Sequence, residues 1–213
     1  MIEITEITET IKYVDGLSVV VFDLDDTLYS EKQYVRSGYC AVAKVIPQIN
    51  DMEKKLWEAF TAGNPAIDTV LKKAGVYTEE LKNYCLTIYR THKPDISLYD
   101  GVIDMLKELH ERGVNIGIIT DGRPEGQKAK IEALGLETMV DEIIITDELG
   151  GGEYRKPCDK AFRLMGERIG KGRYSTMCYV GDNIKKDFIA PEKLGMKVIW
   201  FKNKDGLYVT EKN

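Results

Sequence analysis

The sequence predicts an α/β fold in which helices cover both faces of a parallel sheet, with a helical domain inserted after the first predicted strand. Three observations support this prediction. Apolar runs alternate along the chain with stretches of helical spacing. The runs are continuously apolar, which is typical of parallel strands buried on both faces. Residues 31–96, by contrast, show helical spacing without a convincing strand.

The predicted strands are five apolar runs bounded by Gly, Asp or Pro, at residues 19–22, 114–119, 143–145, 177–180 and 198–201. The predicted helices of the α/β part have apolar residues three or four positions apart, and they lie at residues 102–112, 125–134, 159–169 and 185–194. Several of them are followed by glycine, which readily adopts the left-handed conformation that ends a helix.

The helical segment sets the predicted domain boundaries. It enters after the first strand and leaves before Tyr99-Asp100-Gly101, so it interrupts the α/β part instead of extending it. We therefore expect residues 1–30 and 97–213 to form a Rossmann-like, three-layer catalytic core, and residues 31–96 to form a helical cap. A chain of 213 residues, 43% of them hydrophobic, can bury one sizeable core and a smaller module.

Charge and cysteine usage restrict the class of protein. A formal net charge of −5 argues against a nucleic-acid surface, because binding to phosphate backbones requires basic patches. The four cysteines lack the spacing of a zinc site or a disulfide framework, which favours a reduced, cytoplasmic protein. We expect no membrane partner, because no basic segment precedes an apolar one at the N-terminus and no apolar run is long enough to cross a bilayer.

Polar side chains follow the predicted strands at the points where the chain leaves the sheet. They are Asp23, Asp25, Thr120, Asp121, Gly122, Asp182 and Asp187, joined by Lys156 ahead of a predicted helix. Ligands of open parallel sheets bind beyond the carboxyl ends of the strands, so we expect these residues to converge. Crowded carboxylates favour a hard cation with oxygen ligands, and a Mg²⁺ site is therefore predicted at Asp23, Asp25 and Asp182.

The same residue types suit phosphoryl transfer. A carboxylate can attack phosphorus to form an acyl phosphate that water then hydrolyses, while a second carboxyl group protonates the leaving oxygen and later activates the water. The phosphoryl oxygens would be held by the Thr120 hydroxyl, the backbone N–H groups of Asp121 and Gly122, and the Lys156 ammonium.

Four motifs occur in order along the chain. They are Asp23-x-Asp25-x-Thr27, Thr120 at the end of the next strand, Lys156-Pro157, and Gly181-Asp182-x-x-x-x-Asp187. In this order the motifs resemble the haloacid dehalogenase superfamily of hydrolases over the whole α/β part, and the helical insertion is similar to the cap of one large branch. Each motif alone has an ordinary structural interpretation, such as an Asp-capped turn or a solvated lysine, and only the ordered set favours the functional one.

The resemblance implies a role for each acidic residue. Asp23 is implied to be the nucleophile. Asp25 is implied to be the general acid and base, and also to offer Mg²⁺ a backbone carbonyl. Asp182 is an implied metal ligand, and Asp187 is either a ligand or a support. Dehalogenases of this superfamily lack the acid/base aspartate, so Asp25 favours phosphate chemistry over halide chemistry.

The resemblance further implies that Thr120 and Lys156 bind the phosphoryl group, and that Lys156 also restrains the nucleophile. The sequence departs from the family pattern at three positions. Asp121 and Lys186 stand where Asn is common, and Asp26 stands where Gly is common. These departures concern the substrate side of the site, not the class of reaction.

The expected function is a Mg²⁺-dependent phosphatase that acts on a small phosphorylated metabolite, such as a sugar phosphate or a nucleoside monophosphate, through an aspartyl phosphate. Two alternatives are a phosphosugar mutase that uses the same aspartate pair and a metal-binding interaction protein without catalysis. In the insertion, several polar or aromatic side chains are candidates for substrate contact, although core packing is their more common role; they are Tyr34, Arg36, Tyr39, Arg90 and His92.

Overall fold

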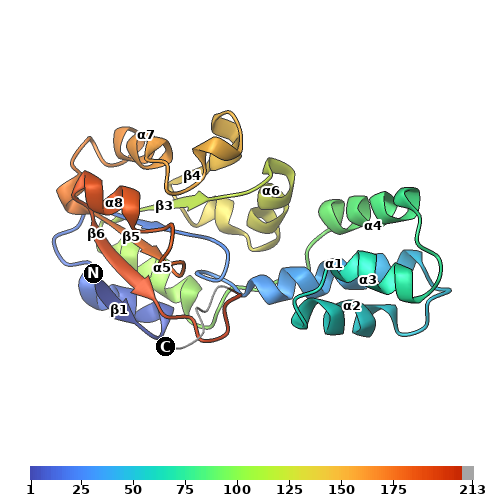
Figure 1. Cartoon of the computed structure of the whole chain (residues 1–213). Coiled ribbons are helices and arrows are strands. Elements are labelled where there is room, and N and C mark those ends of the chain that lie inside the picture. The colour runs from blue at the N-terminus through green and yellow to red at the C-terminus, as the bar shows by residue number, and fades with distance from the viewer. Residues whose placement is uncertain (208–213) are drawn as a thin grey trace. The chain divides into compact units, whose positions relative to one another are not determined.

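The computed structural model describes residues 1–207 and divides the chain into two compact units (Figure 1). The core unit comprises Met1–Glu31 and Ser97–Asn213, and the helical unit comprises Lys32–Ile96. The last part of the predicted core segment, residues 208–213, lies outside the described residues. None of the described helices combines the length and the apolar composition needed to cross a membrane.

The core unit is built on a six-stranded, fully parallel sheet, which confirms the predicted α/β class. In spatial order its strands are β1 (Ile2–Ile4), β6 (Lys197–Phe201), β5 (Met177–Gly181), β2 (Val19–Phe22), β3 (Asn115–Thr120) and β4 (Glu142–Ile145). The short strand β1, which the sequence did not predict, pairs with β6 at one edge. All four residues of β2 are fully buried, as expected for a central strand.

Helices occupy both faces of the sheet. The α-helices of the core unit are α5 (Val102–Glu111), α6 (Pro124–Ala133), α7 (Lys160–Arg168) and α8 (Ile189–Leu194). The 3₁₀ helices are η1 (Ile7–Tyr13), η2 (Leu136–Thr138), η3 (Thr146–Leu149), η4 (Gly152–Tyr154) and η5 (Tyr174–Thr176). Alternate β2 residues Val19 and Val21 pack in one apolar cluster with Phe162 of α7 and Ala190 of α8. Figure 1 shows α5 on the opposite face, where it contacts β3.

The strand order places a crevice at the carboxyl end of β2. The chain runs from β2 outward to β3 and β4 and then returns to β5 on the other side of β2. In register, Phe22 pairs with Ile118 of β3 and with Val180 of β5. Strands that wind away in both directions leave an opening above the central strand, and residues that follow these three strands therefore meet there.

One predicted helix begins later than expected. The predicted helix at residues 185–194 is observed only from Ile189, as α8. Pro191 has no N–H group and is tolerated in the first turn of a helix but not in its interior, which a start at residue 185 would require. The preceding residues form a turn instead, in which the Asp187 carboxylate accepts the N–H of Asn183 at 2.9 Å.

The helical unit contains most of α1 (Glu31–Val45), with α2 (Met52–Thr61), α3 (Ala66–Lys73) and α4 (Glu79–Thr91). Three of the candidate substrate-contact residues pack inside it. The ring of Tyr34 lies 5.8 Å from Tyr89 and 5.0 Å from His92, and Tyr39 lies 5.6 Å from Tyr89. These rings therefore contribute to the core of the helical unit. Whether they also contact substrate stays a prediction.

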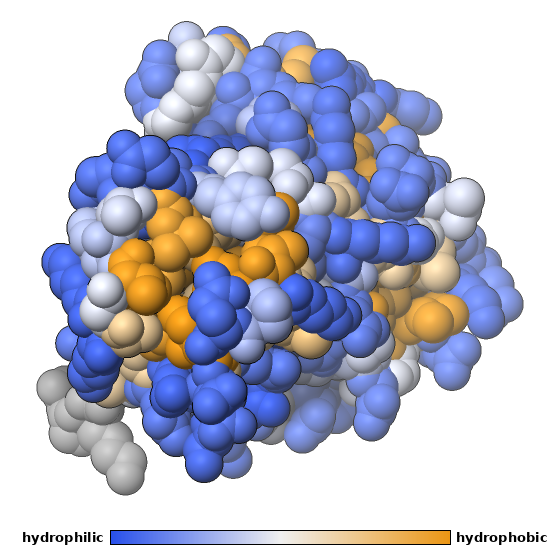
Figure 2. All heavy atoms as spheres, turned by 90° about the vertical axis from the view of Figure 1, so that its right-hand side faces the viewer, coloured by the Kyte–Doolittle hydropathy of each residue, from blue (hydrophilic) through white to orange (hydrophobic). Residues whose placement is uncertain are grey.

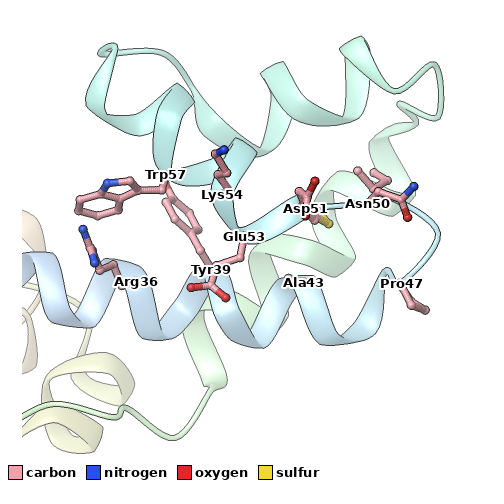
Figure 3. Close-up of a pocket in the computed structure, with 11 residues that line it drawn as sticks. Arg36, Tyr39, Ala43, Pro47, Asn50, Asp51, Glu53, Lys54 and Trp57 are labelled. Carbon is pink, nitrogen blue, oxygen red and sulfur yellow. The ribbon is translucent and has the colours of Figure 1, made fainter.

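The surface of the helical unit has a cavity of about 660 Å³, drawn in Figure 3. At one end the Arg36 guanidinium lies 4.1 Å from the ring centre of Trp57, as a cation–π pair.

Figure 2 shows a face of the molecule on which apolar side chains gather in a patch ringed by hydrophilic ones. The exposed large hydrophobic residues of this unit are Val45, Val76 and Tyr84.

Helix α5 offers a matched test of the core. Leu109 is fully buried, whereas Ile103 on the same helix is 43% exposed. We expect Leu109→Ala to lower the free energy of unfolding by about 2–5 kcal/mol, because it removes buried apolar contacts and leaves a cavity. The change Ile103→Ala should cost no more than about 0.5 kcal/mol. Urea unfolding of both variants checks this, and equal losses would contradict the packing described for α5.

Candidate active site

The carboxyl ends of the central strands open into a cavity of about 380 Å³ within the core unit. Its lining consists of Asp23, Asp25, Glu31, Asp121, Arg155, Lys156, Asp182, Asn183 and Lys186. Five of the residues predicted from the sequence are among them. The other three do not line this cavity: Thr120 and Gly122 flank Asp121 in the chain, and Asp187 accepts a hydrogen bond from Asn183, which does line it.

A buried lysine joins the ends of β2 and β5. The Nζ atom of Lys156 lies 2.5 Å from Asp23 Oδ1 and 2.9 Å from Asp187 Oδ1, and it donates to the Tyr179 hydroxyl at 2.9 Å. The side chains of Lys156 and Asp187 have no exposed surface. Burial alone would lower the pKa of Lys156, but Asp187 and Asp23 raise it well above its ordinary value. Lys156 therefore stays positively charged and holds Asp23 in place.

Three carboxylates lie close enough to share a cation. Asp23, Asp182 and Asp187 each offer one oxygen, and these oxygens lie within 4.8 Å of one another. Burial, reinforced by repulsion from neighbouring carboxylates, raises the pKa of Asp182 to about 9. Burial likewise raises the pKa of Asp23 to about 7, although Lys156 opposes the shift. A divalent cation would favour the charged forms of Asp23 and Asp182, and three carboxylate oxygens are ligands of the kind that a hard metal ion prefers.

A glycine makes room for this cluster. A Cβ atom on Gly181 would lie 2.5 Å from Asp187 Oδ2, which is closer than any side chain can approach. Because β5 ends in glycine, the Asp187 carboxylate can pack directly against the strand end. Glycine is therefore required at position 181 because the Asp187 carboxylate lies too close to leave room for a side chain.

The Asp25 side chain lies outside the acidic cluster and is held by three donors. Tyr29 Oη donates to Asp25 Oδ1 at 2.5 Å, Lys130 Nζ donates to the same oxygen at 2.7 Å, and Gln127 Nε2 donates to Oδ2 at 2.9 Å. Burial would raise the pKa of Asp25, but the charge and hydrogen bond of Lys130 lower it below its ordinary value. The Asp25 side chain thus has surroundings different from those of Asp23. A metal contact through the Asp25 backbone carbonyl stays a prediction.

The sequence analysis missed Gln127 and Lys130. Both are buried on α6, on a helix face that Ile131 and Leu134 continue. Two polar residues on the apolar face of a helix were the available signal, because buried polar groups require partners. Glu31 was also missed; it lines the cavity, and burial raises its pKa to about 8.

Asp121 ties three parts of the site together. Its Oδ1 accepts from the Thr146 hydroxyl at 3.0 Å and from the backbone N–H of Lys156 at 3.1 Å. Its Oδ2 accepts from Lys186 Nζ at 2.9 Å. Asp121 and Lys186, both departures from the family pattern, are therefore partners in one ion pair. Burial would raise the pKa of Asp121, but Lys156 and Lys186 lower it below its ordinary value.

The third departure has a backbone explanation. Asp26 has φ of 55°, in the left-handed region where glycine is favoured and aspartate is among the better tolerated alternatives. Its carboxylate is fully buried and accepts the backbone N–H of Glu31 at 2.9 Å and that of Leu207 at 2.6 Å. The side chain therefore links the start of α1 to the segment after β6.

Thr120 and Gly122 are positioned by Gln127. The buried Thr120 hydroxyl accepts a hydrogen bond from Gln127 Nε2. Gly122 has φ of 138°, and a Cβ atom there would lie 3.3 Å from the Gln127 side chain. Only glycine adopts this conformation readily, so the loop after β3 depends on it. The predicted contacts of both residues with a phosphoryl group stay predictions.

Comparison with known proteins agrees with this geometry. Residues 20–201 match the family of haloacid dehalogenase-like hydrolases. The chain belongs to this family. The predicted resemblance is thereby confirmed, as is the predicted enzyme class, a phosphoric monoester hydrolase of the haloacid dehalogenase type.

Two curated relatives of this haloacid dehalogenase-like hydrolase are archaeal. The glyceraldehyde 3-phosphate phosphatase of Methanocaldococcus jannaschii is 28% identical over 83% of this chain and 81% of its own. The enzyme of the same name from Methanopyrus kandleri is 26% identical over 86% of this chain and 83% of its own. The solved structure of the HAD-hydrolase YfnB from Bacillus subtilis, bound to magnesium, covers 92% of this chain and 90% of its own, with a TM-score of 0.66 and 21% identity, and it supports the fold alone.

Removal of the buried lysine charge tests this arrangement. We expect Lys156→Met to lower the free energy of unfolding by about 3–5 kcal/mol, because it leaves buried carboxylates without their cation. The loss should be larger at pH 8 than at pH 5. The pKa of Asp23 in the folded protein is about 7, so this carboxyl group becomes charged between pH 5 and pH 8 and then needs the lysine most. In the unfolded chain the Asp23 carboxyl group is charged at both pH values.

The control for this measurement is Lys12→Met, which removes an exposed lysine from its pair with Glu9. Exposed pairs contribute at most about 1 kcal/mol, so this variant should unfold close to the wild type at both pH values. Equal losses for the two variants in urea unfolding would contradict a structural role for the Lys156 charge.

Proposed function

We propose that this protein is a Mg²⁺-dependent phosphatase that hydrolyses a small phosphorylated metabolite through an aspartyl phosphate formed on Asp23. The observation that carries the proposal is the pairing of two differently held carboxylates in one cavity. Asp23 is fixed by Lys156 within an acidic cluster, and Asp25 is fixed by donors from α6. Because the two carboxylates lie in different surroundings, one is suited to attack phosphorus and the other to transfer protons.

In the proposed first step, an Asp23 oxygen attacks phosphorus and the bond between phosphorus and the ester oxygen breaks. The leaving oxygen takes a proton from Asp25, which must then be in its protonated form. A dianionic phosphate beside Asp25 favours that form, because a nearby like charge raises the pKa of a carboxyl group. The products of this step are an alcohol and a phosphoryl group on Asp23.

In the second step, a water molecule attacks the phosphorus atom and gives a proton to Asp25. The bond between Asp23 and phosphorus breaks, inorganic phosphate leaves, and Asp25 again carries the proton that the next cycle needs. Lys156, the Thr120 hydroxyl and the backbone N–H groups that follow Thr120 would donate hydrogen bonds to the phosphoryl oxygens in both steps. The water consumed in this step makes the overall reaction a hydrolysis.

The metal in this proposal is Mg²⁺, held by Asp23 and Asp182, with the backbone carbonyl of Asp25 as a further ligand. A bound divalent cation would offset the repulsion between an attacking carboxylate and the phosphoryl oxygens. The raised pKa values of Asp23 and Asp182, caused first by burial and then by neighbouring carboxylates, support a cation at this place, because a cation would favour the charged forms. Asp187, which Lys156 already contacts, would serve as a ligand or as a support.

The substrate class follows from the relatives and from the size of the cavity. The curated relatives described above are named for glyceraldehyde 3-phosphate, a small phosphorylated sugar. A cavity of about 380 Å³ in the core unit has room for a metabolite of this size. We therefore place triose phosphates and similar small phosphate esters first among the substrates to be tested. Residues 31–96 would act as the cap that selects among them and excludes water.

Phosphate release from a panel of phosphate esters tests the function. We expect the wild type to release inorganic phosphate with Mg²⁺ and to lose this activity with a chelator. Asp23→Asn should lower kcat/KM by at least about 10³-fold, because an amide oxygen is a poor nucleophile. The control is Asp104→Asn, which alters an aspartate whose side chain is 87% exposed. Full activity of Asp23→Asn would overturn the proposal, and isomerised sugar phosphate without phosphate release would favour a mutase.

Thermal unfolding tests the metal site without an activity assay. Mg²⁺ at about 100 times its dissociation constant should stabilise the wild type by about 2.7 kcal/mol and raise its Tm. Asp182→Asn removes one carboxylate of the cluster and should abolish most of this shift, whereas Asp104→Asn should retain it. A shift that is equal in all three proteins would place the bound ion elsewhere.

A further inference from the structure

Helix α6 contributes two buried polar side chains to Asp25, a residue that precedes the helix by about 100 positions. Lys130 Nζ lies 2.7 Å from Asp25 Oδ1, and Gln127 Nε2 lies 2.9 Å from Asp25 Oδ2. Gln127 and Lys130 are three residues apart, so they project from the same face of the helix. Neither of them lines the cavity. Both donate to Asp25, which does line the cavity.

The cost of burying these groups indicates that core stability does not explain them. The side chain of Lys130 is only 6% exposed, and that of Asp25 is 18% exposed. Removing such charges from water costs several kcal/mol each, and well-packed apolar residues often replace buried ion pairs without loss of stability. Ile131 and Leu134 show that this face of α6 otherwise packs apolar side chains.

The donors restrict the way in which Asp25 can meet a substrate. A carboxylate has about four acceptor positions, two on each oxygen. Tyr29 and Lys130 occupy both positions on Oδ1, and Gln127 occupies one on Oδ2. Within residues 1–207, these donors leave one position, on the oxygen that Gln127 contacts. Because Asp25 lines the cavity, this position is the one available to a leaving oxygen or a water molecule.

We propose that Lys130 and Gln127 are positioning residues that hold the Asp25 carboxylate so that one oxygen carries out both proton transfers. The inference rests on the proposed function, in which Asp25 protonates the leaving oxygen and then accepts a proton from water. Lys130 takes no part in the proton transfers and acts by fixing the orientation of Asp25. Loss of Lys130 should therefore slow proton transfer and leave the attack by Asp23 unchanged.

Substrates with different leaving groups separate these two effects. An alkyl alkoxide needs a proton to leave, whereas p-nitrophenolate leaves without one. With glycerol 3-phosphate, or a better alkyl ester from the panel, we expect Lys130→Met to lower kcat/KM by about 10²-fold. With p-nitrophenyl phosphate, the initial burst of p-nitrophenolate should keep its wild-type rate. The steady state after the burst should be slow, because the water step still needs Asp25.

Lys128→Met is the matched control, since Lys128 lies on the same helix with its side chain 64% exposed and pairs with Glu148. It should match the wild type on both substrates. Lys130→Arg, which keeps the positive donor, should recover most of the alkyl phosphatase activity. If Lys130→Met does not fold, Lys130→Gln replaces it and is compared with Lys130→Arg by the same two quantities, the alkyl ester kcat/KM and the rate of the p-nitrophenolate burst.

The outcomes distinguish this inference from the proposed function. Slower alkyl ester hydrolysis with an unchanged p-nitrophenolate burst supports a positioning role. A p-nitrophenolate burst that slows by the same factor as alkyl ester kcat/KM indicates a merely structural role and overturns the inference, while the phosphatase assignment stands. A wild type that is inactive on every ester overturns the proposed function and this inference with it.

Discussion

The polar centre of the core unit depends on the ammonium group of Lys156. Its ion pairs join Asp23, which follows β2, to Asp187, which follows β5, and all three residues are buried. Carboxylates at this spacing repel one another strongly once they are buried. The cation offsets part of this repulsion and restrains Asp23 at the mouth of the cavity. The part that it leaves uncompensated is reflected in the raised pKa of Asp182 and supports a metal ion in the proposed mechanism.

Charge compensation also explains how the chain departs from the pattern of its family. An aspartate at position 121 adds a negative charge beside a site proposed to bind phosphate. Lys186, from the turn before α8, pairs with this aspartate and balances the charge. The Asp121 carboxylate also accepts from the Lys156 backbone, so the three segments that follow β3, β4 and β5 are held together by one side chain. The substitutions at positions 121 and 186 are therefore best understood as a pair.

The two catalytic candidates occupy different electrostatic surroundings although they are two residues apart. Burial, together with neighbouring carboxylates, raises the pKa of Asp23, whereas Lys130 outweighs burial and lowers the pKa of Asp25. This difference arises because β2 lies at the centre of the sheet, with β5 on one side and β3 on the other. The β5 side supplies the acidic cluster, and α6, which follows β3, supplies the donors to Asp25. The fold thus gives one short motif two chemical environments.

The sequence by itself determined the alternation of strands and helices and the order of the motif residues. These follow from local patterns, because a buried strand must be apolar and the residues after it must leave the sheet. The contacts of Asp25 with Lys130 and of Asp121 with Lys186 were decided only by the tertiary structure, since they join residues 105 and 65 positions apart. The pairing of the short strand β1 with β6 likewise joins the two ends of the chain. Local patterns specify which residues are buried, but the partner of a buried polar group depends on which distant elements the fold brings together.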